Sequence, residues 1–524
     1  MKKSFIMSYM TKFPTLTCHL TRSLPRLLTQ LCKDKDSPLY GCFDRNFWHY
    51  KIRDFPSMVL QQPIYVLDMI NRGKLPLIEE LNADKEIISE WVVACLKFWS
   101  KSQRKNGSFD EYYPYESGFP PTAFSLYSTA LVCKNRKFDK SILLSMEKAA
   151  AFILLKPEIQ ALNQEIVGLT ACSIVKSLGG KIDSSRLSKR WDNLFLSQNT
   201  EGWFNEYDGA DTGYLSVSCD ALFDYFEIEN DERALKAITK ATDYIFHILA
   251  ADDSIPAMIN SRNTDYILPY ALTRMCQTNE QASSIIKRLI RGIEKPTHYL
   301  YAVDDRYLTH YIYTSWYRCL PYLKNIPETP SIISKGKWFQ DAGVLAIHNN
   351  NSSIHVAAGK GGVVVKTKND GSITKNLGWR SKITKRFYSC THWQEPESNY
   401  SIVKDGSHFT IDLKMPLKKH RFLVPAPSLH IALRLVSRIF GNKIIPVLKN
   451  ILIFRSSKLK GYYKRKIIIE GSEIKIFDSF YSLSHFTWKK ADWQSLRHVS
   501  SAGSFCKSEV QNIDDFTLNI KTTD

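Results

Sequence analysis

Gly202-Trp-Phe-Asn-Glu-Tyr207 matches an earlier segment, Gly107-Ser-Phe-Asp-Glu-Tyr112, about 95 residues before it. Each copy ends a pair of amphipathic patterns and leads through a Gly-rich loop into another one. Repeated helical hairpins cannot bury their apolar faces alone, so they stack as a solenoid or as a closed ring. The repeat therefore predicts a helical domain built from stacked hairpins.

Residues from about 85 to 320 extend this pattern on both sides of the repeat. Apolar side chains recur at a spacing of three to four, as at Ile166, Leu169 and Ile174, which is typical of amphipathic helices. The connections are short and rich in Asn, Asp, Gly and Pro. The predicted helices are Ile87–Gln103, Thr122–Cys133, Lys140–Leu155, Ile166–Leu178, Ser184–Leu196, Tyr214–Phe226, Glu232–Leu249, Tyr266–Cys276, Ala282–Ile293 and Tyr307–Leu320.

The pattern changes after residue 324, where Pro327 and Pro330 end the helical spacing. Short alternating runs with Asn- and Gly-rich turns follow, which is typical of a β-sandwich. We therefore predict a multidomain chain, α then β: an N-terminal incomplete α/α toroid followed by a C-terminal antiparallel β-sandwich. The predicted strands are Val344–His348, Ser353–Ala358, Val363–Lys366, His408–Leu413, Lys466–Ile469 and Glu473–Ile476.

These patterns divide the chain into four parts. Residues 1–84 are expected to be an N-terminal extension that packs on the toroid, and residues 85–324 to form the toroid itself. Residues 325–337 are the predicted linker, and 338–524 the β-sandwich, with a basic amphipathic insertion at 414–466.

The composition of the 524-residue chain is that of an ordinary folded protein, which excludes wholesale disorder, but its net charge is +19. The first 330 residues hold 40 basic and 38 acidic residues, and the last 194 hold 31 and 14. No acidic residue lies between Asp412 and Glu470, a stretch with 14 Lys and Arg. Leu429–Phe440 and Ile444–Phe454 alternate apolar and basic residues at roughly helical spacing. Such helices lie on anionic membranes, and the alternative is a solvated hairpin packed on the β domain.

Other features limit the compartment and the partners. The apolar run within Met1–Lys12 is too short for a secretory signal, and no stretch of about 18 apolar residues occurs. Eleven cysteines without any CxxC pair favour reduced thiols. No zinc finger, RNP-like sequence or helix-turn-helix signature accompanies the positive charge, so no nucleic-acid partner is predicted. We expect a cytoplasmic protein, with peripheral contact to the inner membrane through 414–466 as one possibility.

Two polar clusters precede predicted helices. Asn163-Gln164-Glu165 opens the helix at Ile166, and its alternative role is helix capping. The segment 201–214 groups Trp203, Glu206, Tyr207 and Tyr214. Aromatic rings and carboxylates grouped in this way suit sugar rings and hydroxyls, and the alternative is a structural Gly-rich turn.

A third cluster, Asn260–Tyr270, offers Arg262, Asn263 and Tyr266 in one short segment. A guanidinium forms a fork that fits carboxylates, which suggests an acidic ligand. His310 lies near the end of the helical domain and is either a catalytic or a structural residue. Gly359-Lys-Gly-Gly362 lacks the spacing of a phosphate loop and is predicted to be a turn between strands.

Taken with the domain order, the chain resembles the heparinase II/III-like proteins, polysaccharide lyases that join an α/α toroid to a β-sandwich. The resemblance covers roughly residues 85–480 and rests on 202–207 with Tyr214, on 260–270, and on 338–343 with 359–362. It implies β-elimination of uronate-containing chains, in which an Asn neutralises the carboxylate and a Tyr acts as base, acid or both. By resemblance these roles fall to Asn163 and Tyr214; the position after the Asn, often His in the family, is Gln164 here.

The sequence thus predicts a carbohydrate-active protein that acts on an acidic, uronate-containing polysaccharide, as a β-eliminating lyase of bacterial surface-polysaccharide metabolism. Its partners would be an acidic polysaccharide or a lipid-linked glycan, and no metal or cofactor is expected. The alternative is a catalytically inactive glycan-binding or polysaccharide-assembly protein at the inner membrane surface, which Gln164 would permit. The candidate catalytic residues are Tyr214, Asn163 and His310, and the candidate substrate-binding residues are Arg262, Asn263, Tyr266, Glu206, Tyr207, Trp203 and Gln164.

Overall fold

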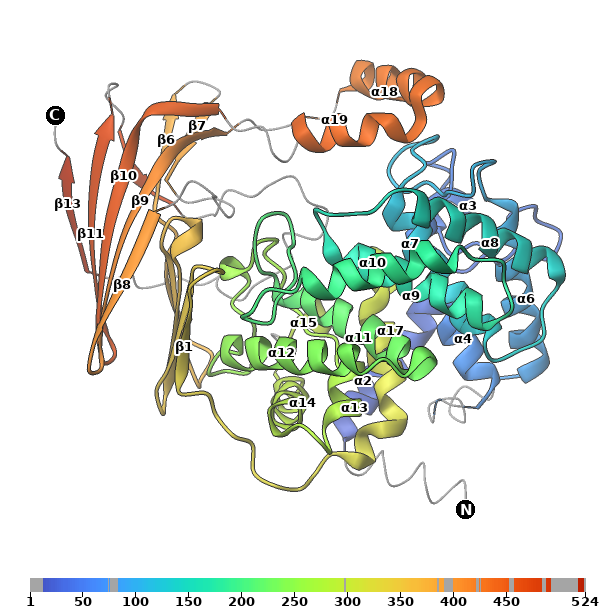
Figure 1. The fold of residues 1–524 in the computed structure, drawn as a ribbon, viewed down its shortest axis with the longest axis horizontal. Helices are drawn as coiled ribbons and strands as arrows, with labels where there is room; N and C mark the ends of the chain where they lie inside the picture. The colour runs from blue at the N-terminus through green and yellow to red at the C-terminus, as the bar shows by residue number, and fades with distance from the viewer. Residues whose placement is uncertain are drawn as a thin grey trace.

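The chain forms a long series of helices followed by two β-sheets (Figure 1). The computed structural model describes residues 13–73, 75, 83–295, 298–383, 386–390, 399–420, 424, 426–451, 457–482, 487–491 and 517–522. The last turn of the helical part, η3, ends at Asn325, and the first strand begins at Gly336. The predicted order, a helical domain and then a β domain, is confirmed.

The helical part is an α/α toroid with an inner and an outer layer. The inner helices α4, α7, α9, α11, α13 and α17 contact one another in that order, and α17 also contacts α4. Residues around most of the circumference of α9 and α11 are buried, as expected for helices with neighbours on all sides. The inner helices are α4 (Ile64–Asn71), α7 (Phe119–Cys133), α9 (Leu162–Ser177), α11 (Thr212–Glu229), α13 (Tyr270–Met275) and α17 (Tyr311–Cys319).

A second row of helices packs outside this ring. Helices α10 and α12 bury a single stripe of apolar residues and expose their other faces, which is typical of a surface helix. The outer helices are α6 (Lys85–Lys101), α8 (Lys140–Leu155), α10 (Ser184–Leu196), α12 (Glu232–Ile248) and α14 (Glu280–Gly292). Short segments between them are α3 (Arg45–Trp48), η1 (Met58–Gln61), η2 (Ala257–Ile259), α15 (Tyr299–Ala302), α16 (Asp305–Leu308) and η3 (Leu320–Asn325).

The N-terminal helix α2 (Pro14–Leu28) packs against the last inner helix. The hydroxyl of Tyr317 donates to the carbonyl of Leu20 at 2.9 Å. Arg26 donates to the Asp305 carboxylate at 2.8 Å. The predicted start of the toroid at residue 85 is too late, because α4, which lies in the predicted N-terminal extension, is one of the inner helices. Residues 1–12, 74 and 76–82 lie outside the described residues.

The repeated sequence motif builds the same turn twice. In the first copy, the side chain of Gln103 donates to the carbonyl of Gly107 at 3.0 Å and to a carbonyl of helix α8. In the second copy, Gln198 donates in the same way to Gly202 at 2.9 Å and to a carbonyl of helix α12. Both glycines have positive φ, +88° and +100°. The repeat therefore locks each loop to the outer helix that follows it.

The β part contains a five-stranded and an eight-stranded sheet. The first is ordered β1-β2-β3-β4-β5, and the second β12-β6-β7-β9-β10-β11-β13 with β8 paired to β9. Every described pair is antiparallel except β11–β13, which is parallel. The strands are β1 (Gly336–Phe339), β2 (Val344–His348), β3 (Ser352–Ala357), β4 (Val363–Lys368), β5 (Ile373–Asn376), β6 (Trp379–Ile383), β7 (Arg386–Ser389), β8 (Asn399–Asp405), β9 (His408–His420), β10 (Ser457–Glu470), β11 (Glu473–Ser482), β12 (Lys489–Lys490) and β13 (Thr517–Thr522).

Strand β4 shows how the sheets are layered. Val364 belongs to the core between the two sheets, whereas Val363 and Val365 belong to the core that the first sheet shares with the helices. Successive side chains of a strand point to opposite faces, so the first sheet is buried on both sides. Figure 1 shows the resulting order of layers: toroid, first sheet, second sheet.

Two predicted helices differ from the observed ones. The helix predicted to begin at Tyr266 begins at Tyr270, because Pro269 occupies the N-cap and residues 263–269 form neither helix nor strand. The helix predicted over Tyr307–Leu320 is two helices, α16 and α17, since His310 between them has extended backbone angles. This break places His310 in the turn between the two helices, and its side chain is buried.

The predicted basic insertion at 414–466 is too wide. Residues 414–420 belong to β9 and residues 457–466 to β10, both strands of the second sheet. Arg465, counted in the insertion, is buried instead and donates to both oxygens of Asp478 at 2.8 and 2.7 Å. What lies between the strands is α18 (Pro427–Phe440), η5 (Gly441–Ile444) and α19 (Ile445–Lys449), and we call residues 427–451 the arm. Residues 421–423, 425 and 452–456 lie outside the described residues.

Ten of the cysteines lie in the described part of the chain, and all ten are free thiols. No helix among the described residues is both long enough and apolar enough to span a bilayer.

The repeat glycines allow a direct test of the fold. In Gly202→Ala the added methyl carbon would lie 2.1 Å from the carbonyl oxygen of Lys240, so we expect a loss of unfolding free energy of about 2 kcal/mol or more. Gly179→Ala is the matched control, because Gly179 also has positive φ but has no atom within 4 Å of the new methyl. The control should lose about 1 kcal/mol. Equal losses in denaturant unfolding of the two variants would contradict this account of the repeat.

Candidate functional site

Three loops meet at the ends where the inner helices α9, α11 and α13 begin. The backbone of Tyr207 donates to the carbonyl of Gln160 at 2.6 Å, and Ala161 forms a bridge with Glu206. Ser261 donates to the carbonyl of Ala210 at 2.9 Å. The segments 158–165, 205–214 and 260–266 are therefore held together by their backbones, and they carry nearly all the candidate site residues.

Asp211 organises the second and third of these loops. It caps helix α11, since its carboxylate accepts from the backbone N–H of Tyr214 at 3.1 Å. The same carboxylate accepts from the backbone N–H of Arg262 at 2.9 Å and from the hydroxyl of Thr264. Thr264 in turn leaves no room for a side chain at position 213, which is glycine. One buried carboxylate thus fixes the backbones that carry Tyr214 and Arg262.

Arg262 is the centre of the site. Its guanidinium carbon lies 4.1 Å from the ring centre of Tyr207 and 5.4 Å from that of Tyr214. Nη1 is 3.4 Å from the Glu206 carboxylate, and among the described residues Nε has no hydrogen-bond partner. Burial opposes its charge, but Tyr214, Tyr207 and Glu206 raise the pKa of Arg262. The Arg262 guanidinium is therefore a fixed cation whose buried Nε–H can donate a hydrogen bond to a ligand.

Glu206 is buried beside this cation. Burial raises the pKa of Glu206 to about 8, although Arg262 acts in the opposite direction. The side-chain amide of Asn163 donates to Glu206. A carboxyl group with this pKa holds its proton at neutral pH, so Glu206 can donate a hydrogen bond or a proton.

Asn163 and Gln164 stand in the first turn of α9, which begins at Leu162. The capping alternative for Asn163 is wrong, because the N-cap residue is Ala161 and no side chain caps this helix. Among the described residues, neither Asn163 Oδ1 nor Gln164 Oε1 has a hydrogen-bond partner, although both atoms are buried. Buried polar atoms are rarely left unpaired in folded proteins. Together with Arg262 Nε, these atoms mark a place that can bind a polar ligand.

Three tyrosines, Tyr214, Tyr266 and Tyr311, form one wall of the cluster. Tyr266 and Tyr311 share a hydrogen bond at 3.0 Å, and Tyr311 is also hydrogen-bonded to Tyr214. Burial raises the pKa of Tyr266 and of Tyr311 well above the usual value for a phenol. Tyr214 and Tyr311 keep part of their surface exposed, whereas Tyr266 is buried. A ligand can thus reach Tyr214 and Tyr311, and Tyr214 is the one that lies next to Arg262.

His310 lies behind this wall. Its ring centre is 5.8 Å from that of Tyr311 and 5.1 Å from that of Tyr307. Burial, together with the charge of Arg306, holds the pKa of His310 well below its usual range. His310 is therefore neutral in this position, and Nε2 has no hydrogen-bond partner among the described residues.

The structure does not bring Trp203 into the cluster. Its indole donates to Glu201 at 3.0 Å, and Glu201 accepts from the backbone of Asp341 and Ala342 at 2.9 and 3.0 Å. Trp203 thus belongs to the junction between the toroid and the first sheet.

Strained backbone occurs at two candidate residues, Tyr207 and Asn263, and at Asp208 next to Tyr207. Tyr207, Asp208 and Asn263 have φ of +52°, +69° and +53°, a region that non-glycine residues seldom adopt. Such strain persists only where surrounding contacts hold it, and it is common at functional sites.

Two lysines of the site were missed in the sequence. Lys360, from the Gly-rich turn η4 (Ala358–Lys360), is fully buried and donates to the carbonyl of Asn260 at 2.6 Å and to Asn263 at 2.5 Å. Lys449, from the arm, pairs with Glu158 at 2.7 Å and lies 5.5 Å from the ring centre of Tyr207. Although burial opposes its charge, Tyr207 and Glu158 raise the pKa of Lys449. Both lysines are far from the cluster in sequence. The glycines on either side of Lys360 are the one sequence feature that could have pointed to it.

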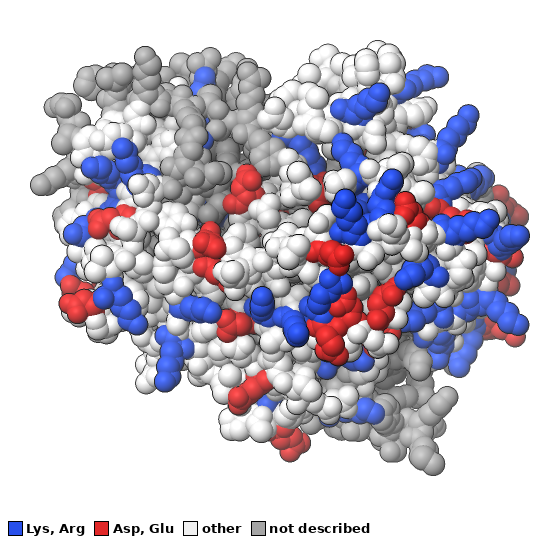
Figure 2. All heavy atoms as spheres, viewed as in Figure 1, with Lys and Arg blue, Asp and Glu red and all other residues white. Residues whose placement is uncertain are grey.

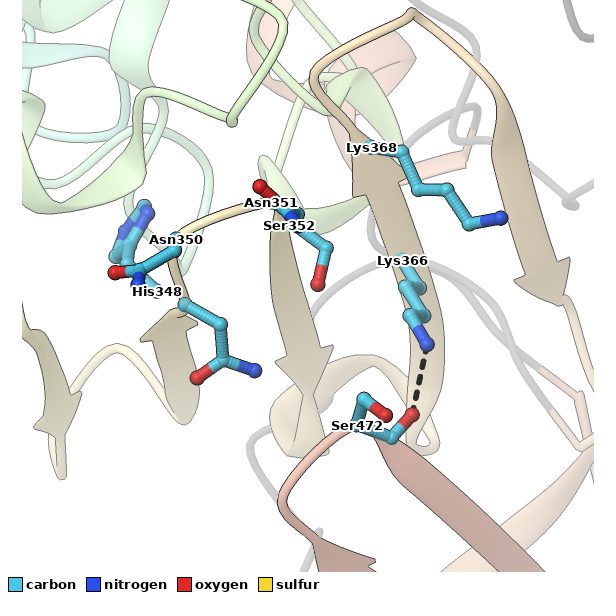
Figure 3. A pocket seen from close by; sticks show the side chains of 8 residues that line it. His348, Asn350, Asn351, Ser352, Lys366, Lys368 and Ser472 are labelled. Atoms are coloured by element: carbon cyan, nitrogen blue, oxygen red, sulfur yellow. Dashed lines mark hydrogen bonds between the residues drawn. The ribbon is translucent and has the colours of Figure 1, made fainter.

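A hollow lies at the edge of the first sheet, away from this cluster (Figure 3). Lys366 there donates to the carbonyl of Ser472 at 2.7 Å, which joins the two sheets. None of the predicted site residues lines it, and the described residues contain no group of three His, Cys, Asp or Glu placed to hold a metal ion. The lining residues are His348, Asn349, Asn350, Asn351, Ser352, Lys366, Lys368 and Ser472.

No protein-family model matches the chain, and no curated protein matches it. Among solved structures it is similar to a heparinase III gene product, at 11% identity and a TM-score of 0.37, and to that gene product with methylated lysines, at 11% and 0.38. It is also similar to a further heparinase III, at 9% identity and a TM-score of 0.39. These matches cover 78%, 78% and 76% of this chain but 61%, 60% and 61% of the matched chains, so it spans about three-fifths of their length. A likeness this weak carries no conclusion about activity.

The raised pKa of Glu206 predicts a pH-dependent stability. The folded chain keeps the Glu206 proton up to about pH 8, whereas an unfolded chain loses it near 4.5, so the unfolding free energy contributed by this group falls as pH rises through that window. Glu206→Gln removes the effect. The unfolding free energy of the variant, relative to that of the wild type, should therefore rise by a few kcal/mol between about pH 5 and pH 8, at about 1.4 kcal/mol per pH unit. Denaturant unfolding at a series of pH values measures this difference.

Glu473→Gln is the control, because this exposed glutamate lies on the second sheet, away from the site. Its difference from the wild type should stay constant over the same range. A constant difference for Glu206→Gln as well would show that Glu206 titrates like an ordinary surface carboxylate.

Proposed function

We propose that the chain is a carbohydrate-active protein of the heparinase II/III-like kind, which cleaves an acidic, uronate-containing polysaccharide by β-elimination. The observation that carries the proposal is the grouping of Arg262, Glu206 and Asn163 next to the partly exposed Tyr214. These are the donors and the base that such a reaction requires.

The first requirement is recognition of the uronate carboxylate. Arg262 offers its unpaired Nε–H, and protonated Glu206 can share its proton with the carboxylate. Both groups lie in a buried environment, where hydrogen bonds to a charge are stronger than in water. Offsetting the carboxylate charge makes the neighbouring C5 proton more acidic, because the electron pair left behind is stabilised. The unpaired side-chain oxygens of Asn163 and Gln164 accept hydrogen bonds, so they suit the sugar hydroxyls rather than the carboxylate.

The second requirement is proton transfer at C5. A phenol acts as a base only where a cation or donors stabilise its phenolate form. Tyr214 has Arg262 on one side and the hydroxyl of Tyr311 on the other. In the proposed step, Tyr214 takes the C5 proton, the C4–O bond breaks, a C4=C5 double bond forms, and the departing oxygen receives a proton from Tyr214 or Glu206. His310 would act as a positioning residue that holds Tyr311, and Tyr266 would hold it from the opposite side.

The second candidate function is a glycan-binding or polysaccharide-assembly protein without catalysis. Two observations favour it: the family histidine is replaced by Gln164, and the amide of Asn163 is already engaged with Glu206. Asn263 and Tyr207 would then serve binding alone, with Lys449 as an added cation for an acidic chain. A lipid-linked glycan of bacterial surface-polysaccharide metabolism suits either function.

Replacement of Tyr214 separates the two functions. In Tyr214→Phe we expect formation of unsaturated uronate ends to fall by about 100-fold or more, because the phenol oxygen that carries the proton is gone, while glycan binding is retained. The measurement is a screen of uronate polysaccharides and lipid-linked oligosaccharides for both ultraviolet absorbance of unsaturated ends and binding, with an uncharged polysaccharide for comparison.

Tyr225→Phe is the matched control, because this tyrosine loses a hydrogen bond to Asp231 outside the site. Its activity should equal that of the wild type. Wild-type turnover in Tyr214→Phe would exclude Tyr214 as the base. Binding of uronate polysaccharides by the wild type without any unsaturated product would favour the binding protein.

A further inference from the structure

Helix α18 of the arm is amphipathic, but its apolar face points away from the protein. Of the 14 residues of α18, Ser437 alone is buried, and its hydroxyl donates to the carbonyl of Pro114 at 3.0 Å. Helices on the surface of a globular protein normally place their apolar stripe against the core. Helix α18 instead turns a serine toward the protein and leaves its apolar side chains in solvent.

The exposed side chains form one stripe. Ile431, Leu435 and Ile439 follow one another at a spacing of four residues, and they are 60%, 61% and 75% exposed. The arm as a whole therefore presents a continuous apolar surface, which an ordinary soluble face does not do. The other large apolar residues exposed on the arm are Leu429, Val436, Phe440, Val447 and Ile451.

The charge of the arm is of one sign. The sequence from 413 to 469 contains no acidic residue. Arg434 pairs with Asp54 and Lys449 with Glu158, and these contacts fasten the inner side of the arm to the toroid. Neither Arg438 nor Lys443 forms an ion pair with any residue that the structure describes. In Figure 2 the same edge of the molecule is a cap of uncharged atoms with Lys and Arg at its margin.

We propose that the arm lies on the surface of an anionic lipid bilayer, with the stripe of Ile431, Leu435 and Ile439 in the boundary between headgroups and acyl chains. Arg438 and Lys443 would contact lipid phosphates. An apolar stripe rimmed by cations is the pattern of interfacial helices, which combine burial of apolar area with attraction to anionic headgroups. An anionic bilayer supplies both the apolar layer and the phosphates that such a surface requires. A protein partner would have to place an apolar face and acidic side chains around it in a matching arrangement.

The position of the arm gives this docking a consequence. Lys449, at the end of α19, touches the site through Glu158 and Tyr207, so docking places the site beside the membrane. Figure 1 shows α18 and α19 above the toroid, at the edge of the molecule. A substrate tethered to a lipid could then be held at the surface that binds the protein. The docking itself does not depend on the proposed chemistry.

The test is flotation of the full chain with vesicles of equimolar phosphatidylglycerol and phosphatidylcholine, compared with phosphatidylcholine alone. We expect the wild type to float with the anionic vesicles at low salt and to be released at high salt. The Leu435→Asp, Ile439→Asp double variant should lose binding by about tenfold or more, since it places charge in the apolar layer. The Arg438→Glu, Lys443→Glu variant should lose about tenfold or more as well.

Matched substitutions elsewhere keep the result specific. Leu196→Asp replaces an exposed leucine of α10, and Lys236→Glu reverses an exposed lysine of α12; both should float like the wild type. Thermal unfolding checks that each variant folds, which is expected because all replaced side chains are exposed. Failure of the wild type to float, or equal flotation of the Asp double variant, overturns the proposal. So does a wild-type dimer in light scattering that the Asp double variant dissociates, because the stripe would then be an interface between copies.

Discussion

The arrangement of the site and of the two domains depends on the hydrogen bonds of one buried ammonium group, that of Lys360. A charged amine buried without hydrogen-bond acceptors would cost several kcal/mol, so the surrounding chain must supply acceptors at fixed positions. Lys360 comes from the turn of the first sheet, and its acceptors, the carbonyl of Asn260 and the side chain of Asn263, belong to the loop of the toroid that carries Arg262. The β domain therefore holds the toroid loop in its strained conformation, and the two domains form one site-bearing unit.

This contact is anchored from behind. Two residues after Lys360, the carbonyl of Gly362 accepts from the guanidinium of Arg465 at 2.7 Å, and Arg465 is paired with Asp478 in the centre of the sandwich. Trp379 and Tyr463 complete the hydrogen bonds of Asp478. A buried ion pair contributes little net stability, but it fixes the position of the groups it joins when every polar atom is satisfied. A chain of hydrogen bonds thus runs from the core of the second sheet to the candidate site.

The site itself combines groups that folding alone would not favour. A cation, a carboxyl group with a raised pKa, and unpaired polar atoms are buried close together in space. Each has a cost in stability, which the closed ring of apolar inner helices offsets. Arg262 is tolerated because Tyr207, Tyr214 and Glu206 surround it. The arm adds a further compromise, an apolar stripe in solvent, and both departures from ordinary folding point to ligands outside the chain.

The sequence by itself determined the elements and much of the site. Period-four and period-two patterns depend on local geometry, so α8 and α10 begin and end as predicted, as does β2. The motif at 202–207 points to Glu206 and Tyr207, because its glycine marks a tight loop and polar residues follow it. The polar segment Asn260–Tyr270 points to Arg262 in the same way. The start of α13 does not follow from the apolar spacing, because that spacing continues through Pro269 although the helix begins only after it. The break at His310 is likewise hidden, because apolar residues continue at helical spacing on both sides of it.

Only the tertiary structure decided which groups meet. Lys449 reaches Tyr207 and Lys360 reaches Asn263 across more than 95 residues of sequence, and Arg465 lies in the core although the sequence around it is uniformly basic. A net charge is a sum over residues and contains no information on which cation is paired inside and which faces outward. That choice depends on burial, since a buried cation is stable only beside its acceptors, and burial is a property of the packed chain.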